Sequence, residues 1–272
     1  MTPLDFLYAA AAAWLAAALT GLLCARTARG LRACCALSAL GGAAAAAGGG
    51  WSLLYGDTAV VSPGAGTITG GPLQLQATSL SGVFTALLGV VAVAIACYAP
   101  RYHEPSPGTA LYLAAYNVAL LACLAVLAAG GMVTFLIAWE TMSLACYLLI
   151  LRHPRDLGVA RGAFWFLALS EAGFLLVVAA FVILSSRTGF TTLSGIAAHA
   201  AAVPGAWRAA AFLLALIGFG FKAGLVPLHV WLPEAHPVAP ADGSAFLSGV
   251  IVKLGVRCGP GAPRDVVESV PR

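Results

Sequence analysis

Long apolar segments recur along the chain, each separated from the next by a short polar or turn-forming stretch. About eight of them approach the 20 residues that an α-helix needs to cross roughly 30 Å of hydrocarbon. No segment alternates apolar and polar residues like a barrel strand, so the pattern predicts an all-α polytopic membrane protein. The predicted helices cover residues 4–24, 31–54, 78–99, 109–129, 132–151, 163–184, 209–226 and 241–256, the last two being the least regular.

Composition supports this fold class and narrows the partners. The chain is 61% hydrophobic and 9% charged, whereas charged residues make up about 25% of ordinary soluble domains. The net charge of +4 is small and dispersed, which argues for a lipid bilayer and against nucleic acid as a partner. The seven cysteines form no Cys-x-x-Cys pair and indicate small apolar side chains rather than a disulfide, zinc or iron–sulfur site. Asp5 and the lack of a basic leader favour a retained first helix over a cleaved signal peptide.

The links between the helices predict an orientation. Seven arginines fall in the first, third and fifth links, two fall in the sixth, and the second and fourth hold none. By the positive-inside rule, the odd-numbered links are cytoplasmic and the N-terminus lies outside, in a bacterial-type inner membrane. The second link, residues 56–71, is rich in Gly, Ser and Thr and predicts an external loop. Residues 185–208 carry apolar side chains at helical spacing and predict a short interfacial helix.

Three charged residues lie inside apolar segments. The chain has only two lysines, Lys222 and Lys253, and both are in such segments, as is Glu140. A charge at bilayer depth costs about 2.5–3.5 kcal/mol on insertion scales. These residues therefore predict a path for protons or ions.

The segment around Lys222 is unlike an ordinary membrane helix. Three glycines precede Pro227, which we expect to break the helix, and Pro233 is expected to prevent a regular restart. Irregular backbone at membrane depth is tolerated where protein buries it or where it lines a hydrated cavity. Lys222 and His229 are then expected to face a hydrated interior. The alternative is a helix that ends at Pro227, with Lys222 reaching to the interface.

Three stretches resemble the charge-bearing helices of one family. FLIAWETMSL at 135–144 resembles the glutamate-bearing fifth helix of the proton-conducting, antiporter-like membrane subunits, and FKAGLVPLHVWLPEAH at 221–236 resembles their broken seventh helix. SGVIVKLG at 248–255 resembles their lysine-bearing eighth helix. Within the family, the wording is most similar to hydrogenase-4 component B (formate hydrogenlyase subunit 3). The L, M and N chains of NADH-quinone oxidoreductase and the cation/proton antiporter subunits are related branches.

The resemblance also implies an organisation into segments. It covers roughly residues 80–255, and the family is built from two inverted five-helix repeats, of which this chain would hold the first. We expect N-terminal helices 1–3 in residues 1–107 and the antiporter-like repeat, helices 4–8, in 108–256. Residues 257–272 are polar and rich in Gly and Pro, unlike a continuing helix, and suggest a frameshift or truncation. Residues 241–244 depart from the family wording.

The resemblance further implies roles for the buried charges. Glu140 would pair with Lys222 across neighbouring helices, so that Lys222 keeps its proton while the pair is closed and releases it towards Lys253 when Glu140 is withdrawn. His229 would relay protons, because its unperturbed pKa of about 6.5 is near working pH. No catalytic, metal-binding or cofactor-binding residues are expected in this chain.

Other ionisable residues receive weaker assignments. Glu171 is a possible proton-path residue that would pair with Arg161 or a cavity water. Glu234 and His236 are possible sites of proton uptake, and a role in a solvated loop is an equal alternative. The histidines outside the apolar segments are expected to be solvated; they are His103, His153 and His199.

Two functional classes fit this resemblance. The first is the membrane subunit of a hydrogenase-4, formate hydrogenlyase or complex-I-like redox assembly, which conducts protons while electron transfer occurs in partner subunits. Those membrane and peripheral partners would carry any iron–sulfur, nickel–iron or flavin centres, and this chain would bind none. The second is a subunit of a monovalent cation/proton antiporter. A truncated, non-functional fragment of either is a further alternative.

Overall fold

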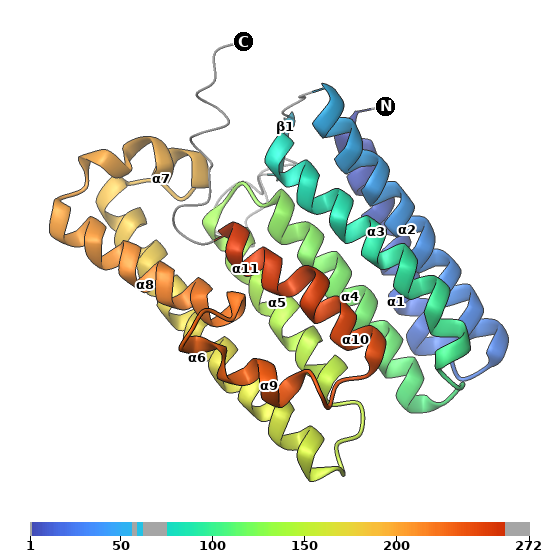
Figure 1. Ribbon diagram of the computed structural model, residues 1–272. Helices are drawn as coiled ribbons and strands as arrows, with labels where there is room; N and C mark the ends of the chain where they lie inside the picture. Colours follow the sequence, from blue (N-terminus) through green and yellow to red (C-terminus); the bar gives the residue numbers. More distant parts are fainter. Residues whose placement is uncertain (1, 56–58, 62–74, 259–272) are drawn as a thin grey trace.

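A computed structural model describes residues 2–55, 59–61 and 75–258 of the chain as a bundle of helices (Figure 1). The long helices are α1 (Pro3–Cys24), α2 (Ala28–Tyr55), α3 (Ser79–Tyr102), α4 (Pro107–Ala128), α5 (Met132–Ile150), α6 (Leu157–Thr188) and α8 (Gly205–Ala223). The short ones are α7 (Leu193–His199), η2 (Ala200–Ala202), η3 (Leu228–Val230), α9 (Trp231–Ala235), α10 (Ala241–Phe246), the π-helical η4 (Leu247–Ile251) and α11 (Val252–Cys258).

The all-α polytopic membrane fold is confirmed. Within the described residues, seven helical segments are long and apolar enough to cross a membrane: α1 to α6, and residues Gly205–Ala235, which combine α8, η3 and α9. The predicted eighth helix forms as α10, η4 and α11 in succession, and the helical run continues through Cys258 rather than ending at residue 256. The tail expected at 257–272 otherwise lies outside the described residues.

Two of the predicted links contain regular structure. The short helix expected within residues 185–208 is confirmed by α7 and η2. The second link was expected to be an irregular loop, but its residues Ala59–Val61 form β1, which pairs antiparallel with β2 (Leu75–Ala77). Three-residue strands leave no hydrophobic periodicity that a sequence pattern can show. The part of that link between the two strands lies outside the described residues.

Local capping fixes where several helices begin. The Thr2 hydroxyl accepts a hydrogen bond from the Asp5 N–H, and the Asp5 carboxylate accepts one from the Thr2 N–H, so Asp5 closes a capping box at the start of α1. Ser106 caps α4 ahead of Pro107, and Asp156 caps α6. These side chains satisfy backbone N–H groups that have no partner within the helix.

The N-terminal helices pack through glycines. α2 lies against both α1 and α3, and α4 lies between this group and α5 (Figure 1). A Cβ atom at Gly49 would lie 2.5 Å from the backbone nitrogen of Ala86 and from the carbonyl oxygen of Gly82 on α3. A Cβ atom at Gly89 would lie 2.4 Å from the backbone of α2. The Ala/Gly-rich stretch 43–50, which could equally reflect nucleotide bias of the genome, therefore contributes to close helix packing.

Adjacent glycines of α2 provide a matched test of this packing. We expect Gly49→Ala to lower the free energy of unfolding by about 1–3 kcal/mol, because the added methyl group forces α2 and α3 apart. Gly50→Ala should be neutral or slightly stabilising, because no atom lies within 4 Å of a Cβ at Gly50. Unfolding by sodium dodecyl sulfate in mixed micelles measures both. Equal effects of the two substitutions would contradict the packing described.

Candidate functional site

The candidate site forms where α6 crosses α8. The two helices approach closely at Gly173 and Gly218: a Cβ atom at either glycine would lie within 2.8 Å of the other glycine's carbonyl oxygen. Ser170 is three residues before Gly173, and Lys222 is four residues after Gly218. Because each is about one helical turn from the crossing, they lie on the facing surfaces of α6 and α8. The glycine crossing thus brings a hydroxyl group to the lysine.

Lys222 is buried among polar and aromatic groups of three helices. Its side chain is 2% exposed, and its Nζ donates hydrogen bonds to Ser143 Oγ of α5 at 2.8 Å and to Ser170 Oγ of α6 at 3.2 Å. The same nitrogen lies 4.6 Å from the centre of the Phe166 ring, a cation–π contact. The structure therefore agrees with an interior location for Lys222 and contradicts the alternative in which it reaches to the interface.

Two glutamates accompany the lysine. Glu140 on α5 and Glu171 on α6 lie near enough to interact electrostatically with each other and with Lys222. Glu140 Oε2 and Glu171 Oε1 are both buried without a hydrogen-bond partner among the described residues. We refer to Lys222, Ser143, Ser170, Glu140 and Glu171 together as the Lys222 site. A buried carboxylate oxygen without a protein partner is a place where a proton or a water can bind.

The expected direct ion pairs are not those that the structure shows. Glu140 was expected to pair with Lys222, but the ammonium group bonds to serine hydroxyls, and within the described residues Glu140 makes no ion pair. The suggested pairing of Glu171 with Arg161 is wrong, because Arg161 pairs with Glu234 at 3.1 Å. The reason is position along α6: Arg161 is almost three turns from Glu171, at the end that contacts α9.

The helix break differs in detail from the prediction. α8 ends at Ala223, where Gly224 adopts a left-handed conformation with φ of 68°, so the helix stops before Pro227 is reached. Pro233 does not prevent a restart, because it lies inside α9. The first turn of a helix tolerates proline, since its N–H would have no partner there. Trp231 Nε1 donates to the Phe221 carbonyl oxygen at 2.7 Å and so satisfies the open end of α8.

The remaining proton-path candidates of this segment are dispersed. His229 lies in η3, and its Nδ1 is buried without a partner in the part of the chain that the structure describes. Glu234 is held in the partly exposed pair with Arg161. His236 follows the membrane segment; its Nδ1 lies 2.9 Å from Ser244 Oγ, and its ring stacks on Trp231. Burial lowers the pKa of His236 and favours its neutral form.

Lys253 lies apart from the Lys222 site. Its side chain is exposed on the surface of the described chain, and Nζ donates to the Ser248 carbonyl oxygen at 2.6 Å, within its own helical run. Gly255, on the same run, faces the end of α8: a Cβ atom there would lie 2.6 Å from the Ala223 nitrogen. The packing of α11 against α8 therefore turns Lys253 to the outside while its neighbours are buried.

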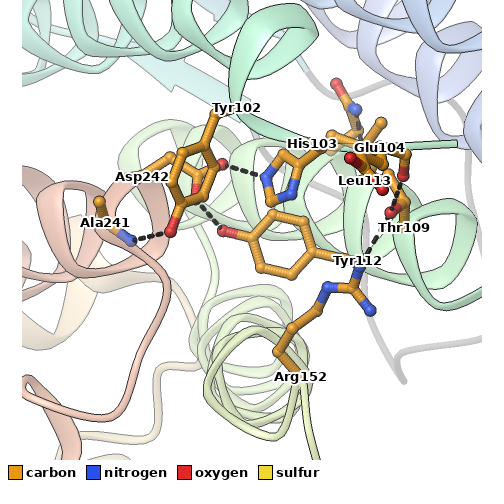
Figure 2. Close-up of polar contacts among 10 residues, drawn as sticks. Tyr102, His103, Glu104, Thr109, Tyr112, Leu113, Arg152, Ala241 and Asp242 are labelled. Atoms are coloured by element: carbon orange, nitrogen blue, oxygen red, sulfur yellow. Dashed lines mark hydrogen bonds and ion pairs between the residues drawn. The ribbon is translucent and has the colours of Figure 1, made fainter.

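A second polar cluster was not anticipated. His103 was expected to be solvated, but its side chain is 6% exposed and its Nε2 lies 2.8 Å from Asp242 Oδ2. Asp242 Oδ1 accepts a hydrogen bond from the Tyr112 hydroxyl at 2.8 Å (Figure 2). His103 and Asp242 are 139 positions apart, a distance at which one sequence gives no pairing signal. His153 and His199 are exposed as expected.

Comparisons with known proteins place this arrangement among membrane subunits. Residues 129–258 match the family described as "NADH:quinone oxidoreductase/Mrp antiporter, TM". An uncharacterised protein of Mycobacterium tuberculosis is 38% identical over 184 residues, which are 68% of this chain and 28% of that protein. Hydrogenase-4 component B of Escherichia coli is 32% identical over 192 residues, 68% of this chain and 27% of that protein.

A solved structure shows the same fold. A chain of the Mrp complex from Dietzia sp. DQ12-45-1b superposes with a TM-score of 0.78 at 25% identity, over 93% of this chain and 27% of that chain. The chain thus spans about 28% of the length of the curated relatives that it matches.

The indole that closes α8 can be tested by substitution. We expect Trp231→Phe to destabilise the fold by about 1–3 kcal/mol, because the buried Phe221 carbonyl loses its hydrogen bond while the ring volume is largely kept. Trp165→Phe is the control, since Trp165 is 36% exposed. Thermal unfolding in detergent, followed by near-ultraviolet circular dichroism, measures both. Equal melting temperatures for the two variants would contradict this role of Trp231.

Proposed function

Because the chain belongs to the family of antiporter-like membrane subunits, we propose that it conducts protons as a membrane subunit of a hydrogenase-4, formate hydrogenlyase or complex-I-like redox assembly. The similarity to hydrogenase-4 component B supports the hydrogenase branch. The single observation that carries the proposal is the burial of Lys222 beside two glutamates, each with a carboxylate oxygen that has no partner among the described residues.

The Lys222 site has the features of a proton-holding site rather than of a structural ion pair. A structural pair would be expected to place a carboxylate in direct contact with the ammonium group, since an uncompensated buried charge is costly. Here serine hydroxyls hold Nζ, and the carboxylates stand further away. A hydroxyl can accept from an ammonium group or donate to a neutral amine, so the same geometry suits Lys222 with and without its proton.

Proton movement then follows from changes in local charge. A proton on Glu140 or Glu171 removes a negative charge near Lys222 and weakens its hold on the proton. Glu140, Lys222 and Glu171 would exchange protons through internal water, with His229 at the broken end of α8 and Lys253 as the next station. Lys253 reaches this path only if other helices of the assembly cover its exposed side. A shape change driven by partner subunits would bias the exchange.

The proposal extends to the surroundings of the chain. We infer that the links bearing Arg101, Arg152, Arg155 and Arg161 face the cytoplasm of a bacterial cell, with the N-terminus outside. Electron transfer would take place in partner subunits that carry iron–sulfur, nickel–iron or flavin centres. The chain would then be a non-redox subunit of an oxidoreductase.

A monovalent cation/proton antiporter is the second candidate. The fold similarity to a chain of the Mrp complex favours it. The Lys222 site would serve the proton half of such an exchange, and a separate oxygen-rich site would be needed for the cation. Proton transport that requires a sodium gradient, and not electron transfer, would identify this function.

Substitutions at the Lys222 site test the proposed function in the complete, reconstituted assembly. Lys222→Ala should reduce proton transport at least tenfold, because no other group at this position can hold the proton, and Glu140→Gln should reduce it similarly. Electron transfer by the partner subunits should persist in part. A pH-sensitive dye inside proteoliposomes measures transport.

Two controls accompany this experiment. Lys222→Arg keeps the charge but holds its proton permanently, so it should fail like Lys222→Ala although it preserves a cation. Glu104→Gln removes an exposed carboxylate and should leave transport unchanged. Wild-type transport rates in Lys222→Ala would overturn the proposed function.

A further inference from the structure

The buried cluster of His103, Asp242 and Tyr112 has no part in the function proposed above. It joins the ends of three helices: His103 directly follows α3, Tyr112 lies in the second turn of α4, and Asp242 lies in the first turn of α10. The side chains of His103 and Asp242 are 6% and 1% exposed. Both oxygens of the Asp242 carboxylate are in use, one with His103 and the other with the Tyr112 hydroxyl (Figure 2).

A buried histidine–carboxylate pair can bind and release one proton at modest electrostatic cost. When the second ring nitrogen of His103 takes up a proton, the imidazolium forms beside an anionic Asp242, so the pair becomes neutral overall. When that proton leaves, the ring is neutral and the carboxylate is still held by the Tyr112 hydroxyl. A clamp between helices needs no titratable groups, since well-packed apolar residues stabilise such a contact as well or better.

The charged and titratable groups around the pair come from every neighbouring element. Arg152, which follows α5, lies with its guanidinium carbon 5.9 Å from the centre of the Tyr112 ring and donates to Thr109. The groups that interact electrostatically with Asp242 or contact His103 are Cys35 of α2, Tyr98 and Tyr102 of α3, and Tyr112 and Tyr116 of α4. Arg152 is therefore the cation of this end of the bundle that faces the cluster.

A line of polar groups leads from this cluster towards the Lys222 site. Tyr116 lies one turn beyond Tyr112 on the same face of α4; it is buried, and its hydroxyl has no hydrogen-bond partner in the described part of the chain. Tyr116 is near enough to interact electrostatically with both Asp242 and Cys123. Cys123 interacts in the same way with Cys146 and Lys222. A buried hydroxyl without a protein partner is the kind of group that binds an internal water.

We propose that His103 and Asp242 form a proton-uptake station at this end of the bundle, from which protons reach Lys222 by way of Tyr116 and the Cys123–Cys146 contact between α4 and α5. The station rests on the proposed function, since it supplies the Lys222 site. It lies at the end where α3, α4 and α10 meet the links with most of the arginines, so it takes protons from the side assigned to the cytoplasm.

Substitution and chemical rescue test this station in the complete, reconstituted assembly. His103→Ala should reduce proton transport at least tenfold, and millimolar imidazole in the medium should restore a large part of it, because a free base can replace the missing ring. A purely structural role of His103 would give no such rescue. Asp242→Asn keeps the shape and the hydrogen bond of the pair but removes its charge, and should also reduce transport. His153→Ala, at an exposed histidine, is the matched control.

Nuclear magnetic resonance of ¹⁵N-histidine in the full chain in nanodiscs gives a readout that does not need transport. The His103 ring signal, assigned by its loss in His103→Gln, should respond to pH, and its titration midpoint should change in Asp242→Asn while the other histidines are unaffected. A His103 signal that is independent of pH between about 5 and 9 would overturn the station.

The outcomes separate the two proposals. Normal transport in His103→Ala, together with loss of transport in Lys222→Ala, contradicts the station and leaves the proposed function intact. A wild-type assembly that transports no protons contradicts the proposed function and the station together. Imidazole should not rescue Lys222→Ala; if it does, the rescue is unspecific and the station is rejected.

Discussion

A lysine ammonium group inside a bundle of apolar helices needs hydrogen-bond partners, and this constraint decides how α5, α6 and α8 meet. Water is not available to solvate Lys222 from the outside, because its side chain is 2% exposed. Ser143 and Ser170 provide the oxygen atoms, one from each neighbouring helix. The small residues Gly173 and Gly218 allow the close approach of α6 and α8 that brings Ser170 within reach.

The end of α8 adds to the same requirement. Lys222 lies in the last turn of the helix, where the partial negative charge of unpaired carbonyl groups favours a cation. Gly224 ends the helix there, and the Trp231 indole satisfies the Phe221 carbonyl. The break therefore leaves few open backbone groups while it keeps the lysine at a helix terminus. Glu140 and Glu171 stand close enough to change the charge around Lys222 without contacting it, which permits the proton to be held and released.

Much of the fold follows from the sequence, because apolar length alone decides which segments can cross a membrane. Lys222 and Glu140 were found by the same logic, as charges that an apolar segment would otherwise exclude. Ser143 and Ser170 were missed because serine is common in membrane helices; the available signal was that Ser143 follows Glu140 by one turn and Ser170 directly precedes Glu171. His103 was misjudged because its burial depends on Asp242, which is distant in sequence. The end of α8 was placed at Pro227, although Gly224 is the residue whose positive φ stops the helix.

The most direct test of the account measures the proton on Lys222. The chain has only two lysines, so ¹⁵N-lysine labelling gives one Nζ signal for Lys222 and one for Lys253. At a fixed pH, Glu140→Gln should change the Lys222 signal towards that of a less protonated amine and leave the Lys253 signal unchanged, because only Lys222 lies within the electrostatic reach of Glu140. A Lys222 signal that is the same with and without the Glu140 charge would contradict the central claim that this site holds and releases a proton.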